Sequence, residues 1–559
     1  MPHWDWLIMA VVLAFGWLAP HLGERWFHAL ETFFSRIAAR RTAAVALIFF
    51  STIALRLALL PLMPVPAPGI ADEFSYLLMG DTFAHGRLAN PTPPLWVSFE
   101  SFHINMFPTY SSMYPPAQGF VLMLGQLLGH PWIGVLLSVA AMCAALVWML
   151  QAWIPARWAF LGGVIAVLKF GLISYWMNSY WGGAVAAAGG ALVLGALARI
   201  LRRPRPRTRD ALLLGLGVAI LANSRPYEGL VFCVPAAGAF LLWLNRRSSL
   251  PWDVKLRRIV LPLAACLALT GAFIAYYNWR LTGDALLMPH VLNNRTYRST
   301  GEFIWDQTKP PLHYRNHQFE VAYNLFFRNY YQGTWNDLKR ITANKIKLYN
   351  EVFLWLGAVP LLCCLPLTFG DRHKRLLLVE LAVSILAFFP VVWFYPHYQA
   401  PALCVLYALL LQTLRHIRTF SFHGRPVGRG LSRAVFLLLL LSLAISFSGR
   451  IQNVSYGFWN NDTGILERAR IAGILNHTPG KHLVLVRYGR VHYVHSEWVY
   501  NAADIDGSKV VWAREMDPQQ NQKLLAYFHD RRVWLVQPEE LDHMLSAYTP
   551  PEMPAPGKP

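Results

Sequence analysis

The sequence predicts an α-helical polytopic membrane protein with about 11–12 spans, and three observations support this fold class. Of its 559 residues, 55% are hydrophobic and 14% are charged, which is too apolar for a soluble core of ordinary size. Mostly apolar runs recur along the chain, and a helix of roughly 20 such residues crosses a bilayer because it pairs its own backbone groups. Lys and Arg collect in alternate loops between these runs.

The apolar runs define the predicted spans. A further run at 117–128 is too short to cross the membrane, and we expect it at the interface. The first span follows no positively charged segment and precedes no small-residue cleavage site, which favours a retained helix over a signal peptide. The predicted spans are 5–22, 43–63, 131–152, 157–176, 182–201, 211–224, 227–244, 258–279, 351–369, 375–394, 396–413 and 434–448.

The formal net charge of +20 would suggest nucleic-acid binding in a soluble protein, but its distribution argues for a topology signal instead. The basic loops lie at 25–41, 199–209, 246–258, 372–375 and 415–433, and Arg157 lies in a further short loop of this set. The positive-inside rule assigns them to the cytoplasm and the intervening loops to the other side. The excess of basic residues therefore indicates how the protein is oriented in the membrane, and contact with anionic lipids is a secondary effect.

Three domains follow from this topology. Residues 1–42 form an extra helix and a cytoplasmic linker, and 43–448 form the membrane domain, with outer loops near 64–130 and 280–350. Within the second loop, 335–349 is an amphipathic helix that lies on the membrane or is simply a solvated loop helix. Residues 449–559 read as a separate soluble extracytoplasmic α/β domain. Its expected strands are 483–486, 510–512 and 533–536, and its expected helices are 463–475 and 521–528.

Four short polar constellations lie at the outer ends of predicted spans. They contain Asp72-Glu73-Phe-Ser-Tyr76, Asn178-Ser-Tyr180, Arg225-Pro-Tyr-Glu228 and His397-Tyr398. Ionisable residues near a bilayer are costly and are therefore functional candidates. Convergence of a base candidate, a cation and hydrogen-bonding aromatic residues on one side would suit group transfer from an anionic lipid.

Three of the constellations also have a structural explanation. Asp72 and Glu73 could cap an interfacial helix, since acids favour helix N-termini. Arg225 and Glu228 could form a structural ion pair, and His397 could anchor a helix at the interface. Two further residues in the first loop, Glu100 and His103, have a spacing that could serve a divalent metal, but two ligands leave a metal unsupported. No cofactor is indicated with certainty.

These residues carry a resemblance to a known superfamily. An outer loop opening with Asp72-Glu-x-x-Tyr76, many short spans joined by small polar loops, and His397-Tyr-x-x-Pro401 at a helix start resemble the GT-C membrane glycosyltransferases. Within them the chain is most similar to glycosyltransferase family 39, the protein O-mannosyltransferase and lipid A aminoarabinose transferase group. The resemblance covers roughly 43–413 and leaves the C-terminal domain unexplained.

The resemblance implies transfer of a sugar from a polyprenyl-phosphate donor to a hydroxyl of a glycan, lipid or protein, usually with inversion. The reaction would occur on the outer face of a bacterial inner membrane. By this resemblance Asp72 is the base, and Glu73 orients the acceptor or takes the base role itself. Arg225 and His397 would contact the phosphate. The remaining candidates would form the pocket wall: Tyr76, Asn178, Tyr180, Glu228 and Tyr398.

A transporter or flippase of a lipid-linked saccharide is the alternative from another functional class. Transporters place ionisable groups near the bilayer midplane in broken, repeated helices. Here Lys169 is almost the sole such group inside a predicted span, and the acids gather at one face. An assembly protein built around the C-terminal domain would leave the four constellations without a role.

Overall fold

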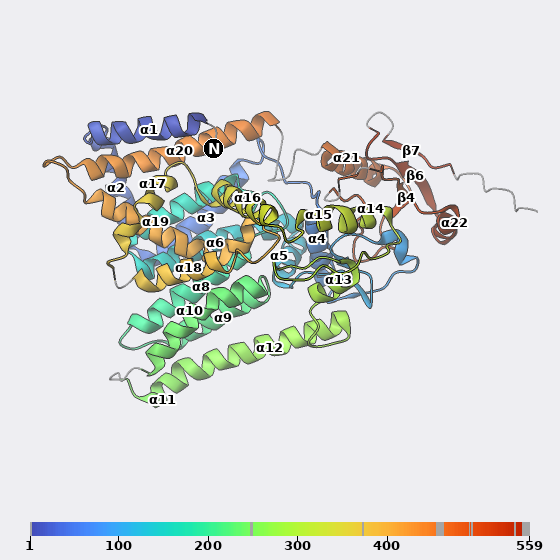
Figure 1. The fold of residues 1–559 in the computed structure, drawn as a ribbon, viewed down its shortest axis with the longest axis horizontal. Helices are drawn as coiled ribbons and strands as arrows, with labels where there is room; N and C mark the ends of the chain where they lie inside the picture. The colour runs from blue at the N-terminus through green and yellow to red at the C-terminus, as the bar shows by residue number, and fades with distance from the viewer. Residues whose placement is uncertain are drawn as a thin grey trace, which may run out of the picture.

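Long helices form a bundle, and loops and a small α/β unit cover one of its ends (Figure 1). The computed structural model describes residues 3–245, 250–371, 374–453, 463–490, 492–493, 496–540 and 544–549. Parts of two predicted basic loops, at 246–249 and 372–373, lie outside the described residues.

Seven helical segments in the described part of the chain are long and apolar enough to cross a membrane, by length and composition. The protein is therefore an α-helical membrane protein, as predicted. The seven segments are α3 (Arg41–Ala58), α6 (Pro131–Trp153), α8 (Ala184–Arg202), α10 (Pro226–Asn245), α11 to α12 (Trp252–Lys255 and Leu261–Thr282), η7 to α19 (Pro396–Ala402 and Leu403–Arg418) and α20 (Val427–Asn453).

The other predicted spans coincide with shorter helices. They are α1 (His3–Leu18), α7 (Ala156–Ala166) with the π-helical turn η2 (Val167–Leu172), α9 (Thr208–Ala222) and α18 (Arg375–Leu386). The run 351–369 differs most, because it is divided among the last turn of α16 (Trp335–Phe353), α17 (Ala358–Cys363) and the 3₁₀ turn η5 (Leu365–Thr368). Pro360 and Pro366 lie in these two pieces, and proline lacks the N–H that a continuous helix requires. An amphipathic helix, α2 (Glu24–Ala39), links α1 to α3.

Small residues on α8 bring a later segment close to it. A Cβ atom on Gly190 would lie 2.1 Å from the carbonyl oxygen of Pro401, so only glycine permits this approach. Small residues allow such contact between membrane helices. The contact fixes η7, which carries two predicted site residues, His397 and Tyr398.

The first outer loop folds over the end of the bundle. It contains α4 (Ala71–Ala84), β1 (Asn90–Pro91), β2 (Ile104–Asn105), β3 (Thr109–Ser112) and α5 (Ala117–Leu127). The strands are antiparallel in the order β1-β3-β2. Ser75 of α4 donates a hydrogen bond to the carbonyl of His103 at 2.7 Å, and its hydroxyl lies 2.7 Å from that of Ser112. The start of α4 is thereby fixed against this small sheet.

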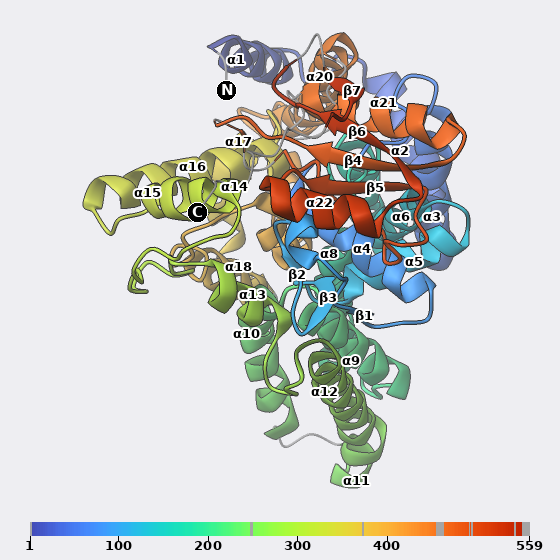
Figure 2. The same cartoon turned by 90° about the vertical axis from the view of Figure 1, so that its right-hand side faces the viewer.

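The second outer loop is mainly helical. Its elements are α13 (Pro289–Tyr297), α14 (His317–Glu320), the π-helical turn η4 (Val321–Phe327), α15 (Arg328–Tyr330) and α16 (Trp335–Phe353). The helix expected at 335–349 is thus present as α16. It lies crosswise to α20 and α12 rather than along the bundle (Figures 1 and 2).

The C-terminal α/β unit has the strands and helices that the sequence predicts. It contains α21 (Thr463–His477), β4 (Lys481–Val486), β5 (Val510–Arg514), α22 (Pro518–Tyr527), β6 (Arg531–Val536) and β7 (Leu545–Ala547). The sheet order is β5-β4-β6-β7, with β4 parallel to β5 and β6 and with β7 antiparallel to β6.

The α/β unit shares a hydrophobic core with the first loop. Leu483 and Leu485 of β4 belong to the same buried cluster as Leu78, Phe99 and Ile104 of the loop. Figure 2 shows the sheet lying over α4 and α5. The unit therefore holds α4 in place, although the sequence alone predicts that it is a separate domain.

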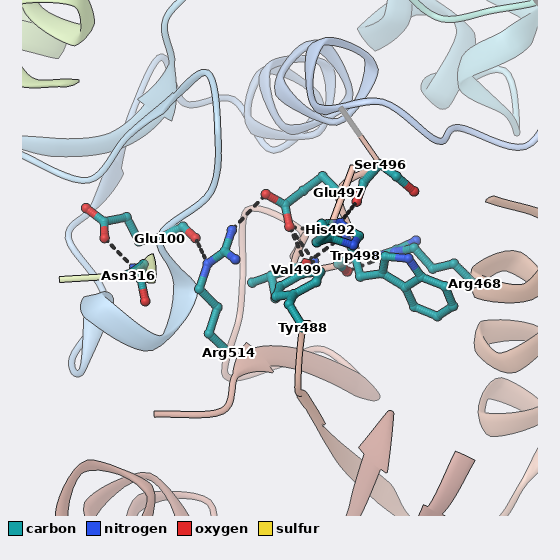
Figure 3. Close-up of polar contacts among 10 residues, drawn as sticks. All are labelled: Glu100, Asn316, Arg468, Tyr488, His492, Ser496, Glu497, Trp498, Val499 and Arg514. Atoms are coloured by element: carbon teal, nitrogen blue, oxygen red, sulfur yellow. Dashed lines mark hydrogen bonds and ion pairs between the residues drawn. The ribbon is translucent and has the colours of Figure 1, made fainter. Parts of the chain in front are cut away.

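A buried polar network joins the α/β unit to both outer loops (Figure 3). The Arg514 guanidinium donates to the carbonyl of Glu100 at 2.7 Å and to the carboxylate of Glu497 at 2.8 Å. The Glu100 carboxylate accepts hydrogen bonds from Tyr297 at 2.9 Å and Asn316 at 2.6 Å in the second loop. Glu100 is thus the point at which three segments meet.

Candidate functional site

A cavity of about 350 Å³ opens where the two outer loops meet the ends of the helices. Four predicted residues line it: Asp72, Arg225, Glu228 and Tyr398. The structure brings them together from three of the four predicted constellations.

Asp72 is the acid of the cavity. It lies in the first turn of α4 and is 7% exposed. The Tyr114 hydroxyl donates a short hydrogen bond to its Oδ1 atom, and His103 Nδ1 lies 3.5 Å from its Oδ2 atom. His103 has φ +63°, and its carbonyl accepts from the Met113 backbone at 3.1 Å. This turn directs the imidazole toward Asp72 and the Tyr114 hydroxyl, which is 3.3 Å from Nδ1.

Glu73 has a different environment. One carboxylate oxygen accepts hydrogen bonds from the N–H groups of Gly69 at 2.9 Å and Ile70 at 3.4 Å, and the other accepts from the N–H of Tyr180 at 3.0 Å. Burial raises the pKa of Glu73 to about 7, against the lowering effect of these three donors. Glu73 does not line the cavity. Its contacts cap α4 and tie it to the segment before α8.

Arg225 supplies positive charge to the cavity. It lies between α9 and α10, and its guanidinium carbon is 4.6 Å from the centre of the Tyr398 ring. Its side chain contacts this ring, and among the described residues the guanidinium makes no hydrogen bond or ion pair, to Glu228 or to any other residue. Burial alone would lower its pKa, but Tyr76, Glu228 and Tyr398 raise the pKa above the ordinary value. The group is a permanent cation that faces the cavity.

The second loop contributes a further polar cluster that sequence reasoning missed. Glu302 Oε1 lies 2.7 Å from His290 Nε2 and 3.3 Å from Arg298 Nη1, and it accepts from Asn294 at 2.6 Å. Burial lowers the pKa of His290, while Glu302 raises it. The spacing 290, 294 and 298 is that of one helix face, a signal that the sequence does contain; His290 and Asn294 lie in α13, and Arg298 caps its end.

The other predicted residues lie behind the cavity wall. The Tyr76 ring stacks on Tyr114 with centroids 4.4 Å apart. His397 is buried, with Nδ1 3.0 Å from the Tyr175 hydroxyl, and its ring is parallel to that of Tyr395, which does line the cavity. These contacts support the wall rather than form its surface.

Asn178 and Tyr180 make structural contacts away from the cavity. The Asn178 side chain accepts from Arg56 at 2.9 Å and donates to the carbonyl of Ser174 at 2.9 Å. The Tyr180 hydroxyl donates to the carbonyl of Pro66 at 2.9 Å. Both residues connect the segment before α8 to the end of α3 and the chain that follows it.

Glu100 and His103, whose spacing in the sequence could serve a metal, have different hydrogen-bonding partners. Glu100 is engaged by Tyr297 and Asn316, whereas His103 turns to Asp72. Within the described ranges, no group of three or more His, Cys, Asp or Glu residues could hold a metal ion.

Comparisons with known proteins give structural neighbours but no sequence match. No protein-family model matches the sequence, and no curated protein matches it. The fold is similar to ArnT from Cupriavidus metallidurans bound to undecaprenyl phosphate, with TM-score 0.48, 12% identity, and coverage of 89% of this chain and 92% of that one. The apo state of that ArnT gives TM-score 0.48, 13% identity, and coverage of 90% and 93%.

A second similar structure is the Archaeoglobus fulgidus oligosaccharyltransferase tethered with an acceptor peptide. The TM-score is 0.48 and the identity is 11%, over 88% of this chain. The present chain spans 65% of the length of that protein.

Proposed function

We propose that the protein is a membrane glycosyltransferase that moves a sugar from a polyprenyl-phosphate donor to an acceptor hydroxyl, with inversion, at the outer face of a bacterial inner membrane. One observation carries the proposal. The Asp72 carboxylate and the Arg225 guanidinium line the same cavity, and the guanidinium has no hydrogen-bonding partner among the described residues.

Asp72 is the proposed general base. A hydroxyl attacks an anomeric carbon poorly unless a nearby group accepts its proton in the transition state. The new bond joins the acceptor oxygen to the anomeric carbon, the bond from that carbon to the phosphate oxygen breaks, and the proton passes to Asp72. Tyr114 and His103 hold the carboxylate in one orientation. Attack on the side opposite the phosphate inverts the anomeric centre.

Arg225 is the proposed phosphate contact. The lipid phosphate departs with the bonding electrons, and its negative charge needs a cation already in position. A guanidinium suits this role because its planar fork donates two parallel hydrogen bonds to phosphate oxygens. The Tyr398 ring lies beneath the guanidinium and supports it.

The remaining cavity lining suits a sugar. Tyr227, Tyr395 and Tyr398 offer rings and hydroxyl groups, and Glu302 with Asn294 offers a hydrogen-bonding cluster. Sites of this kind combine apolar walls with a few placed polar groups that fix orientation. Glu228 stands beside Arg225 on the wall and is a candidate contact to the sugar hydroxyls.

The test uses the full-length protein in lipid nanodiscs with labelled polyprenyl-phosphate sugars and candidate acceptors. We expect covalent transfer by the unaltered protein, loss of transfer with Asp72→Asn, and weaker donor binding with Arg225→Ala. Arg280→Ala is the matched control, because Arg280 is exposed and does not line the cavity. In a parallel assay the protein is reconstituted in liposomes. Labelled lipid that crosses their membrane without forming a new glycosidic bond would favour a flippase and contradict the proposal.

A further inference from the structure

A second, larger cavity lies on another side of the bundle. It has a volume of about 1010 Å³ and lies between α16, α17, α20 and the π-helical turn η2. It shares no lining residue with the first cavity. Its wall is mostly apolar, with Trp355, Leu439 and Leu443 among its residues, and the proposed transfer reaction does not use it.

Lys169 gives this cavity a cationic group. It lies in η2 inside the predicted span 157–176. Its ammonium is 3.4 Å from the carbonyl oxygen of Glu351 and 3.3 Å from that of Leu354, at the end of α16. An ionisable residue within a membrane span is costly and marks a functional site by default.

A second lysine stands at the α16 wall of the cavity. Lys347 lines the cavity and is exposed, as is the neighbouring Ile346. The crosswise direction of α16 is that expected of a helix in the membrane interface (Figure 2). With Lys169, Lys347 and Glu351 as the charged residues of the lining, the cavity has an excess of positive charge.

We propose that the second cavity binds a membrane lipid with a net negative phosphate headgroup. The headgroup lies against Lys169 and Lys347, and the chains follow the apolar surface of α17 and α20, where Leu439 and Leu443 line the wall. Lysine is a common phosphate-binding residue that acts as a point charge. This inference is independent of the proposed transfer reaction, because no residue of the first cavity takes part.

The experiment measures binding of phosphatidylglycerol and phosphatidylcholine to the purified full-length protein by native mass spectrometry. We expect selective retention of phosphatidylglycerol, and about tenfold weaker binding with Lys347→Gln, since a hydrogen bond to a charged group contributes on this scale. Lys169→Gln should weaken phosphatidylglycerol binding more than Lys347→Gln does. Ala343→Trp should reduce binding by filling the cavity from the exposed face of α16, without removing the contacts of Lys169.

Lys339→Gln is the matched control, since Lys339 is exposed on the same helix but lies outside the cavity lining. Equal retention of the two lipids, or unchanged binding in both Lys347→Gln and Ala343→Trp, would overturn the proposal. Displacement of phosphatidylglycerol by inorganic phosphate at equal concentration would also overturn it, because it would assign the site to free phosphate. These outcomes do not depend on glycosyl transfer, so they are separate from the test of the first cavity.

Discussion

Arg225 and Arg514 lie at the same end of the protein, and their surroundings are opposite. Arg514 is 2% exposed, donates to Glu100 and Glu497, and stands over the Tyr488 ring at 5.0 Å. Arg225 faces a cavity and has a Tyr398 ring contact but no hydrogen bond or ion pair in the described part of the chain. A buried charge requires a partner, so the first arginine is part of the structure and the second is available to a ligand.

The same contrast separates two neighbouring acids. Glu73 accepts three backbone hydrogen bonds, whereas Asp72 contacts Tyr114 and His103 at the cavity. Successive residues of a helix differ in direction by about 100°. One residue therefore fixes α4 while the next reaches the cavity. The following predictions test this contrast. Side chains that are fully hydrogen-bonded within the protein should affect stability, and side chains that face the cavity should affect sugar transfer or donor binding.

The largest effect is expected for Asp72→Asn. Loss of the proposed base should lower the rate of sugar transfer by about 10²–10⁴-fold, because the amide cannot accept the acceptor's proton. The midpoint of thermal unfolding should change little, since the amide oxygen still accepts from Tyr114. Single-turnover assays and unfolding scans measure the two quantities. Full transfer activity in a folded Asp72→Asn protein would remove the base assignment.

Arg514→Ala should lower the free energy of unfolding. Removing one partner of a buried pair leaves Glu497 charged and unpaired, which costs about 3–5 kcal/mol. Thermal unfolding in detergent, monitored by tryptophan fluorescence, should show an earlier transition. The double variant Arg514→Leu with Glu497→Leu should recover part of the loss, because it leaves no charge unpaired. Equal instability of the single and double variants would show that the pair itself is not the cause.

Arg225→Ala should reduce donor binding by about 10–100-fold, the scale of a hydrogen bond to a charged group, and should leave the unfolding midpoint almost unchanged. Arg225→Lys should restore only part of the affinity, because an ammonium lacks the planar fork. Equilibrium binding of a polyprenyl phosphate measures this effect. Unfolding as early as that of Arg514→Ala would contradict the contrast between the two arginines.

Much of the fold could be predicted from the sequence, because apolar length and strand patterns are local signals. The strands expected at 483–486, 510–512 and 533–536 are present as β4, β5 and β6. The break at 351–369 follows from Pro360 and Pro366, whose effect a count of apolar residues does not register. The shared core between Leu485 and Ile104 depends on contacts between distant segments, which periodicity cannot reveal.

Part of the site could also be predicted, because the predicted spans give a membrane topology. Span ends on one side of a membrane must lie near one another, so Asp72, Arg225, Glu228 and Tyr398 could be grouped from topology. Topology does not give the direction of each side chain, and Asn178 and Tyr180 turn into structural contacts. Glu302 and its partners lie in a loop without a recognisable motif, although the spacing from His290 to Arg298 indicates one polar helix face.

The smallest effect is expected for Glu73→Gln, and it concerns the pH dependence of stability. The pKa of Glu73 rises from 4.5 to about 7 on burial, so the folded state favours the neutral form. Its contribution to stability is fully present below pH 4.5 and is lost as the pH rises to about 7. Glutamine cannot ionise, so the variant's unfolding midpoint should vary less over this range.

Glu320→Gln is the control. This residue is exposed, and its variant should keep the pH dependence of the unaltered protein. A Glu73→Gln variant with unchanged pH dependence would show that the carboxylate stays ionised among its three N–H donors. If transfer also persists in this variant, the neighbouring acid at position 72 alone carries the chemistry.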